Sequence, residues 1–125
     1  MNEPAVILLS VLREGVDAYK KQIASQARAI VGPEALTVEQ HKVLEKTVEA
    51  ELESFVWFVL GRFDNVGCSL PENVLGYRII AKPYTRSETG ELQRLPESDI
   101  REEEQDYADM WQDFLSARDV ERAGP

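Results

Sequence analysis

The chain holds one cysteine and one histidine, the side chains most often used as a nucleophile and its general base. Cys68 lies in the turn-rich segment 64–76, DNVGCSLPENVLG, and His41 lies near the start of a predicted helix. A helix of about twenty residues separates its two ends by about 30 Å. A catalytic Cys68–His41 pair is therefore not expected, and we interpret His41 as a partly buried packing residue.

Cys68 is the only cysteine, so the chain forms no internal disulfide and offers no set of thiolates to a zinc ion. Because Cys68 lies among Gly and Pro residues rather than on a periodic apolar face, we expect Cys68→Ser to leave the fold intact. The sequence contains no glycine-rich phosphate loop, no HExxH motif and no CxxC pair. We therefore expect neither a cofactor nor an enzyme activity.

Three carboxylates, Glu45, Glu49 and Glu53, follow one another at steps of four residues, which places them on one side of a helix. A di-iron site of the helical-bundle type needs a Glu-x-x-His pair from each of two helices, and one histidine cannot supply both. We expect these carboxylates to face basic residues of an antiparallel neighbouring helix. The basic residues available there are Arg13, Lys20 and Arg28.

The segment 96–109, PESDIREEEQDYAD, is the densest run of acidic residues. One interpretation is a solvated helix face whose acids complement the positive end of the helix dipole. The other is an acidic and aromatic surface for a basic protein, because acidic and aromatic residues run side by side. The candidate protein-binding residues are Glu102, Glu103, Asp106, Tyr107, Asp109 and Trp111.

The elements that must position these residues are mainly helices. Residues 4–31 and 37–62 repeat apolar residues at steps of three and four, as amphipathic helices do. Gly32, followed by a proline, predicts the end of the first helix, and Thr37 with Gln40 predicts a capping box at the start of the second. The short connection predicts a long antiparallel helical hairpin.

The remaining residues read as a loop with short strands followed by a third helix. Residues 64–96 are rich in turn-forming residues, and two short alternating stretches within them predict a small β-hairpin or an extended arm. Residues 98–118 repeat apolar residues at helical spacing, with Ser98 as the expected N-cap. The predicted fold class is therefore mainly α with a small β part (α+β).

The stretch Phe55–Leu60 consists of six consecutive apolar residues at the end of the second predicted helix. A helix that becomes apolar on every side is usually surrounded by protein. We therefore expect Phe55 and Phe58 to be buried, and truncation of either to alanine to cost about 3–5 kcal/mol. The alternative is a ligand pocket with an arginine that holds an anion. Its residues would be Phe58, Cys68, Tyr77, and Arg62 or Arg78.

The 125 residues carry a net charge of −9, from 23 acidic and 14 basic residues, and 43% of them are hydrophobic. This composition is typical of a globular protein, and we predict that residues 1–125 form a single domain. The negative charge disfavours nucleic acid and anionic membranes as partners. We recognise no signal peptide and no apolar stretch of the roughly 20 residues that a membrane span needs, which favours a cytoplasmic protein.

These observations favour a non-catalytic protein-binding module, of the inhibitor or immunity type, that binds a basic partner. A self-associating structural protein is the second hypothesis, and a small-molecule or anion-binding protein or enzyme is the third. The second rests on geometry, because helices about 39 Å long exceed the diameter of about 36 Å expected for a compact chain of this size. The apolar run Ala5–Leu12 then needs more cover than the last helix gives, so a homodimer is expected.

Overall fold

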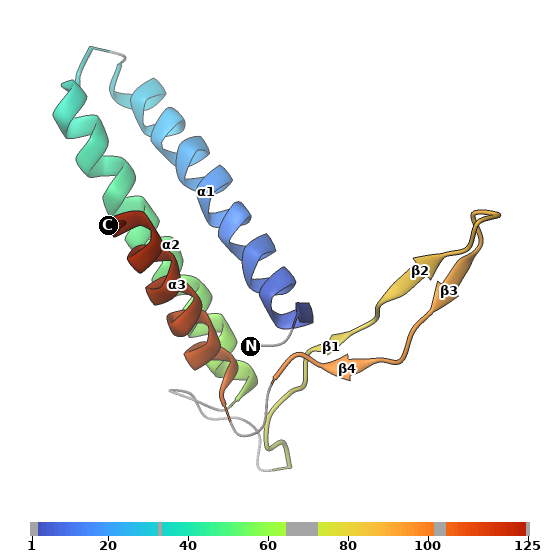
Figure 1. Ribbon diagram of the computed structural model, residues 1–125. Helices are drawn as coiled ribbons and strands as arrows, with labels where there is room; N and C mark the ends of the chain where they lie inside the picture. The colour runs from blue at the N-terminus through green and yellow to red at the C-terminus, as the bar shows by residue number, and fades with distance from the viewer. Residues whose placement is uncertain (1–2, 33, 65–72, 102–104, 125) are drawn as a thin grey trace.

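In the computed structural model, three helices form the body of the molecule and a two-stranded ribbon projects from one end of it (Figure 1). The structure describes residues 3–32, 34–64, 73–101 and 105–124. The helices are α1 (Glu3–Val31), α2 (Val38–Phe63) and α3 (Tyr107–Ala123). The ribbon pairs β1 (Ile80–Ala81) with β4 (Ser98–Asp99) and β2 (Tyr84–Arg86) with β3 (Leu92–Arg94), both antiparallel. The predicted fold class, mainly α with a small β part, is confirmed.

Helices α1 and α2 form the predicted antiparallel hairpin (Figure 1). Gly32 follows α1 with a φ of 96°, a left-handed conformation that glycine adopts without a steric penalty, and its N–H donates to the Arg28 carbonyl oxygen. Thr37 and Gln40 form the predicted capping box, in which each side chain accepts a hydrogen bond from the backbone N–H of the other. These two signals in the sequence fix where the hairpin turns.

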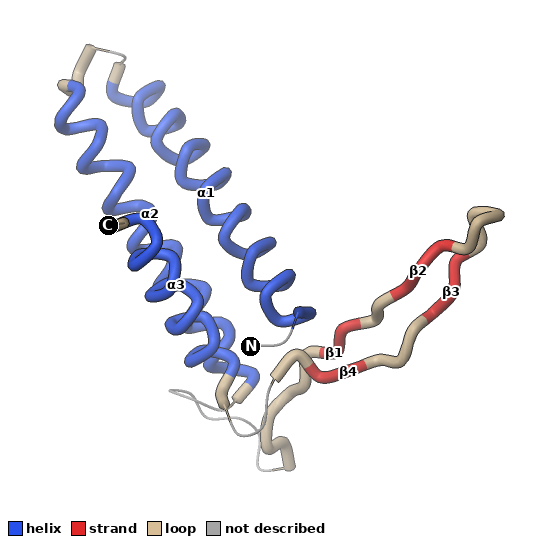
Figure 2. The backbone as a smooth tube through the Cα atoms, viewed as in Figure 1, coloured by secondary structure: helices blue, strands red, loops and turns tan. Residues whose placement is uncertain are grey.

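Helix α3 lies along α2 on one side of the hairpin (Figure 2). The largest fully buried side chains, Trp111, Tyr107, Leu9 and Met110, meet in the core between the three helices. The indole Nε1 of Trp111 donates to the backbone carbonyl oxygen of Glu53 at 3.0 Å. Because a buried indole N–H needs an acceptor, this bond and the packing around it together hold α3 on α2.

The last helix begins at Tyr107 rather than near Ser98, and it continues to Ala123 rather than to residue 118. Asp106, and not Ser98, occupies the N-cap position. Ser98 instead pairs with Ala81 in the ribbon. The prediction of the N-terminal boundary is therefore wrong, because pairing with a distant strand outweighed a local capping signal.

The root of the ribbon is fixed to α3 by polar contacts around one tyrosine. The hydroxyl of Tyr107 accepts from the Ile79 N–H and donates to Asp99, both at 2.8 Å. Arg78 Nε donates to the other carboxylate oxygen of Asp99 at 2.9 Å, and the Ile100 N–H donates to the Ile79 carbonyl oxygen at 3.1 Å. These contacts set the direction in which the ribbon leaves the helical body (Figure 2).

Asp64, which follows α2, is a second carboxylate at this end of the molecule. It accepts from Arg101 at 2.7 Å and from the Tyr107 backbone N–H at 2.6 Å. Its side chain is almost completely buried. Burial raises the pKa of Asp64, and the nearby Asp106 raises it further, in opposition to the two hydrogen-bond donors.

Phe55 and Phe58, which we predicted to be buried, are 63% and 46% exposed. Residues two positions apart on a helix point about 200° away from each other. The side of α2 that turns Glu53 toward α3 therefore turns Phe55 the other way. Among the described elements, α3 covers only one side of the hairpin. Within the run Phe55–Leu60, Leu60 is therefore the one residue that is buried.

Candidate protein-binding surface

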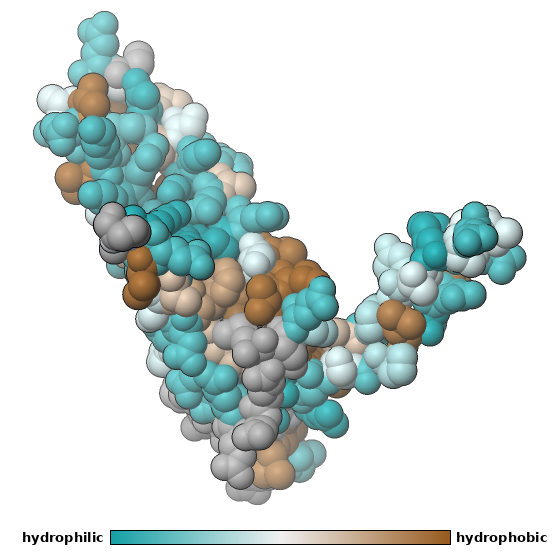
Figure 3. All heavy atoms as spheres, viewed as in Figure 1, coloured by the Kyte–Doolittle hydropathy of each residue, from teal (hydrophilic) through white to brown (hydrophobic). Residues whose placement is uncertain are grey.

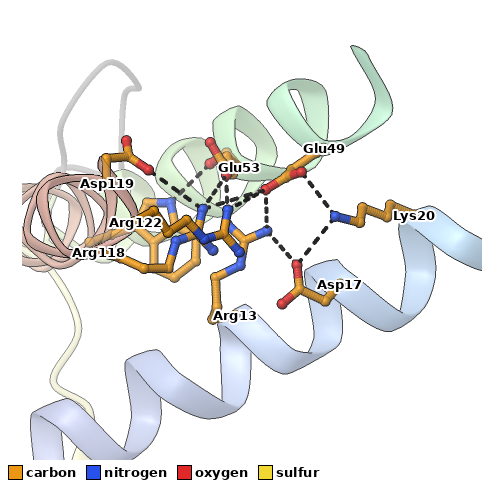
Figure 4. Close-up of polar contacts among 9 residues, drawn as sticks. Arg13, Asp17, Lys20, Glu49, Glu53, Arg118, Asp119 and Arg122 are labelled. Atoms are coloured by element: carbon orange, nitrogen blue, oxygen red, sulfur yellow. Dashed lines mark hydrogen bonds and ion pairs between the residues drawn. The ribbon is translucent and has the colours of Figure 1, made fainter. Parts of the chain in front are cut away.

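On the face of the hairpin that α3 covers, a cluster of charged side chains joins the three helices (Figure 4). Arg13 lies at its centre and is only 5% exposed. Its guanidinium group lies 2.6 Å from Glu53, 3.0 Å from Glu49 and 2.7 Å from Asp17. An arginine this deeply buried is tolerated because three carboxylates surround it.

Three further cations of the described residues complete the charge cluster, and one of them, Arg122, lies 3.8 Å from Glu49. Lys20 reaches Glu49 from α1 at 2.9 Å, and Arg118 reaches both Glu49 and Glu53 from α3 at 3.4 Å. Burial alone would raise the pKa of Glu49, but its ion pairs with Lys20, Arg13 and Arg118 lower it below its usual value. The predicted pairing of the carboxylate stripe with Arg13 and Lys20 is confirmed for Glu49 and Glu53.

The opposite face of the hairpin carries an open apolar groove between the two helices, which we call the α1–α2 groove. It consists of two adjoining hollows of about 390 Å³ and 320 Å³. Six of the side chains that line the larger hollow are Leu8, Leu12, Phe55, Val56, Val59 and Phe63. The smaller hollow shares three of these and continues along the helices to Tyr19 and Leu52.

The sequence places charge on one face and apolar groups on the other by the same helical geometry in both helices. In α1, Val11 and Gly15 each lie two positions from Arg13, and in α2, Phe55 lies two positions from Glu53. Each such pair points about 200° apart. The residues that bring Arg13 and Glu53 into the charge cluster therefore turn their neighbours into the groove.

The rim of the α1–α2 groove exposes large apolar side chains. Phe55, Val11 and Tyr19 are 63%, 56% and 52% exposed. Figure 3, which views the molecule from the side of α3, shows a further group of apolar atoms over the N-terminal part of α1, beside the root of the ribbon. The larger hollow is lined by carbon-rich side chains alone, without a charged or amide group among the described residues that line it. Contiguous exposed surface of this kind usually marks a site of interaction.

The structure describes four of the six predicted protein-binding residues. Tyr107 and Trp111 are 1% and 0% exposed, so they belong to the core and present no aromatic surface to a partner. Asp106 is the N-cap of α3, and Asp109 is exposed in its first turn. Glu102 and Glu103 lie outside the described residues. Of the predicted surface, the described residues leave Asp109 exposed on α3, whereas both aromatic side chains are buried.

The residues of the predicted ligand pocket have separate neighbours. The guanidinium group of Arg62 lies 4.6 Å from the centre of the Phe58 ring, whereas Tyr77 packs edge-on against Phe63 with ring centres 6.1 Å apart. Arg78 is paired with Asp99 at the root of the ribbon. Cys68 lies outside the described residues.

His41 is half-buried near the start of α2, as we predicted for a packing residue, with Nε2 3.2 Å from Glu45. Within residues 3–32, 34–64, 73–101 and 105–124, no group of three or more His, Cys, Asp and Glu side chains is placed to hold a metal ion. Of the described helices, none combines the length and the apolar character needed to cross a membrane.

Comparisons of the chain with models of protein families, with curated proteins and with solved structures found no match. Function is therefore inferred from the surfaces of the molecule. Sequence reasoning assigned the groove residues of α2 to the core, because their spacing is that of a buried helix face. The signal that pointed elsewhere was the run Ala5–Leu12, which is apolar on nearly every side and was expected to need cover beyond that of the last helix.

Proposed function

We propose that this chain is a non-catalytic protein-binding module and that the α1–α2 groove is its binding surface. The observation that carries the proposal is the exposed Phe55 ring at the junction of two apolar hollows. An aromatic side chain has about 150–250 Å² of surface to bury, so covering the exposed part of Phe55 would contribute about 3 kcal/mol. That is the contribution of a typical hot-spot residue in a protein interface.

The composition of the groove favours a protein segment over a small molecule. Small-molecule sites combine an apolar wall with a few polar groups that orient the ligand. The described lining of the larger hollow offers no such group, and the nearby Arg62 is stacked on Phe58. An apolar surface without orienting groups matches the apolar side of a helix or strand, whose polar groups remain outside.

The length of the groove sets the size of the segment it holds. From Leu8 to Tyr19 the groove follows α1 for about 17 Å, at 1.5 Å per residue. A helix of about three turns, with apolar residues at positions i, i+3 or i+4, and i+7, has this length, and so does a strand of about five residues. The partner therefore needs only one short apolar segment.

A basic partner is a second candidate, supported by where the charge lies. The last 24 residues, 102–125, hold eight of the 23 acidic residues and two of the 14 basic ones. Asp109, Asp113 and Glu121 are exposed on α3. An acidic surface of this kind speeds association with a basic protein, and the effect weakens as salt is added. Reversal of Asp109 and Asp113 to lysine should then lower the association rate of such a partner.

Site-specific photo-cross-linking tests the groove. A photoreactive phenylalanine is placed at residue 55 of the full chain in its own cells, and the same group at residue 43 serves as the matched control. Val43 is 63% exposed on the same helix, as Phe55 is, but it does not line the groove. We expect a defined protein adduct from residue 55 and none from residue 43.

The adduct should disappear when a second change, Leu12→Asp, places a charge in the groove. Leu12 is half-buried and lines both hollows, so circular dichroism is used to confirm that the variant keeps its helices. Equal labelling from residues 55 and 43, or no adduct from residue 55, would contradict the proposal.

A further inference from the structure

A second apolar surface without cover lies on the ribbon beyond its root, in residues 82–95, which we call the distal ribbon. Every residue of β2 and β3 is exposed. Tyr84, Leu92 and Leu95 are 56%, 55% and 46% exposed, and they line a shallow hollow of about 260 Å³. A two-stranded ribbon with both faces in water is marginally stable. The distal ribbon therefore needs a surface to lie on.

The pairing register gives one face of the distal ribbon a particular chemistry. Tyr84 pairs with Arg94, and Arg86 pairs with Leu92. Paired residues, and residues two apart on one strand, project from the same face of a ribbon. One face therefore carries two apolar side chains and two arginines, arranged diagonally.

The α1–α2 groove is the complement of this face. Its floor is apolar, and an exposed acidic residue stands at each outer edge: Glu14 on α1, next to Gly15, and Glu51 on α2, one turn before Phe55. Residues 82–95 hold three basic and two acidic residues in a chain whose net charge is −9. The distal ribbon is thus a segment that can approach the acidic body of another copy without charge repulsion.

The groove and the ribbon are also continuous with each other on one molecule. Ile79 lines the larger hollow of the groove and directly precedes β1. A further hollow of about 360 Å³ joins Ile7 of α1 to Ala81, Lys82 and Pro83 of the ribbon. The contacts around Tyr107 hold the ribbon away from its own groove at a set angle (Figure 1).

We propose that the α1–α2 groove binds the distal ribbon of a second copy of this chain, and that the exchange is reciprocal about a two-fold axis. The inference rests on the proposed function, namely that the groove binds protein, and it names the partner. In such a dimer the Tyr84 and Leu92 side chains lie against Leu12 and Phe55 of the partner copy. Arg86 and Arg94 reach the carboxylates at the edges of the groove.

The area of the two surfaces supports an exchange rather than a contact of groove against groove. The groove covers about 17 Å by 20 Å, or about 340 Å², across two helices. A specific dimer needs about 500 Å² or more from each copy. The distal ribbon, about 23 Å long and 10 Å wide, adds about 230 Å² per face, which brings each copy above that value.

Sedimentation equilibrium of the full chain is the first test. We expect a dimer of twice 14.2 kDa at micromolar concentration. Phe55→Asp in the groove, and Tyr84→Asp with Leu92→Asp in the distal ribbon, should each raise the dissociation constant about 30-fold or more, the effect of losing one hot-spot residue. Val43→Asp, at an equally exposed site outside the groove, should leave the dimer intact.

A mixing experiment distinguishes reciprocal exchange from any other dimer. The groove variant keeps an intact ribbon, and the ribbon variant keeps an intact groove, so a mixture of the two restores one of the two contacts. We expect the mixture to form a heterodimer at concentrations where each variant alone is monomeric. A groove-to-groove dimer would not be rescued in this way, and the absence of rescue would overturn the exchange.

A wild-type chain that stays at 14.2 kDa up to about 100 µM, far above the dissociation constant expected for an interface of this size, would also overturn the inference. A monomeric chain would not contradict the proposed function, which the cross-linking experiment tests separately. An adduct between residue 55 and a different protein would support a binding groove with another partner. An adduct with a second copy of this chain would support both proposals.

Discussion

The α1–α2 hairpin has one face that α3 covers and one face that the described residues leave open, and the two faces differ in chemistry as well as in burial. The covered face contains the charge cluster around Arg13 together with the Trp111 core. The open face contains the apolar groove. The usual arrangement, in which apolar groups are buried and charges are exposed, is thus partly inverted on this hairpin.

This inversion separates the residues that stabilise the fold from those that we propose for binding. On the covered face a buried arginine is matched by three carboxylates, and removing one member takes a partner away from each residue it contacts. On the open face Phe55 is largely exposed, so its loss costs the monomer little. Four substitutions or conditions test this contrast, starting with the largest expected effect.

Trp111→Ala should cause the largest loss of stability, about 3–5 kcal/mol, because it removes a fully buried indole together with its hydrogen bond to the Glu53 carbonyl oxygen. Urea unfolding followed by circular dichroism measures the change. In a protein of ordinary stability, about 5–15 kcal/mol, this loss approaches complete unfolding. A loss below about 1 kcal/mol would show that α3 contributes little to the covered face.

Arg13→Ala should lower the free energy of unfolding by about 2–3 kcal/mol. This is less than the roughly 3–5 kcal/mol typical of a broken buried ion pair, because Lys20 and Arg118 still neutralise part of the carboxylate charge. The same unfolding experiment measures it. Arg62→Ala is the control, since Arg62 is exposed and stacked on Phe58, and should change stability by less than about 1 kcal/mol. Equal losses for the two arginines would remove the distinction between the faces.

The charge cluster should also make stability depend on pH in the acid range. Burial alone would raise the pKa values of Glu49 and Asp17, but their ion pairs lower both below the usual values. A carboxyl with a lowered pKa in the folded state binds fewer protons there than in the unfolded chain. Its contribution to the stability of the fold is therefore fully present above its ordinary pKa and is lost as pH falls through the lowered value. Asp64, whose pKa is raised by burial, acts in the opposite direction.

Burial alone would also raise the pKa of Asp99, but hydrogen bonds from the Arg101 backbone, Arg78 and Tyr107 outweigh it and lower that pKa below its usual value. Unfolding free energies measured between about pH 7 and pH 3 should therefore fall below about pH 4, where Asp17, Glu49 and Asp99 outweigh Asp64. The fall should be smaller in Glu49→Gln, which removes one of these groups. A wild-type stability that rises steadily as pH falls through this range would contradict the ion-pair assignment.

Phe55→Ala should have the smallest effect on the monomer, less than about 1 kcal/mol, because the ring is already 63% exposed. This corrects the loss of about 3–5 kcal/mol that follows from the sequence pattern alone. The measurement is made on Tyr84→Asp/Leu92→Asp chains, so that any dimer does not contribute to it. A loss as large as that of Trp111→Ala would place the groove in the core.

Local sequence signals predicted the hairpin well. Gly32 and the Thr37–Gln40 capping box fix its turn through backbone bonds made within a few residues, so no distant part of the chain alters them. The pairing of Arg13 with the carboxylate stripe followed from helical periodicity in two antiparallel helices. These features depend on spacing alone, and spacing is what a sequence shows.

The start of the last helix and the exposure of Phe55 depend on distant partners. Ser98 is a sound N-cap candidate, but its pairing with Ala81 decides its structure. The spacing of Phe55 is that of a core residue, yet burial requires another element on that side, and α3 lies on the other. Periodicity identifies a face that needs cover and cannot say what covers it. The groove, and with it the candidate site, was therefore predicted only as an apolar run at the N-terminus.

The contacts of the Tyr107 hydroxyl have a consequence for the order in which the chain folds. This single oxygen joins α3 to the backbone at Ile79, 28 residues earlier, and to Asp99 on the returning strand. The α1–α2 hairpin closes a short loop and forms early. Helix α3 reaches α2 across 58 residues at the Trp111–Glu53 bond, and the junction needs Tyr107 in place on α3. The ribbon should then acquire its orientation in the last step of folding. Pulse-labelled hydrogen exchange would follow this directly: the Ile79 amide should become protected with α3 and after the amides of the hairpin, so that a newly made chain completes its core before it presents the ribbon.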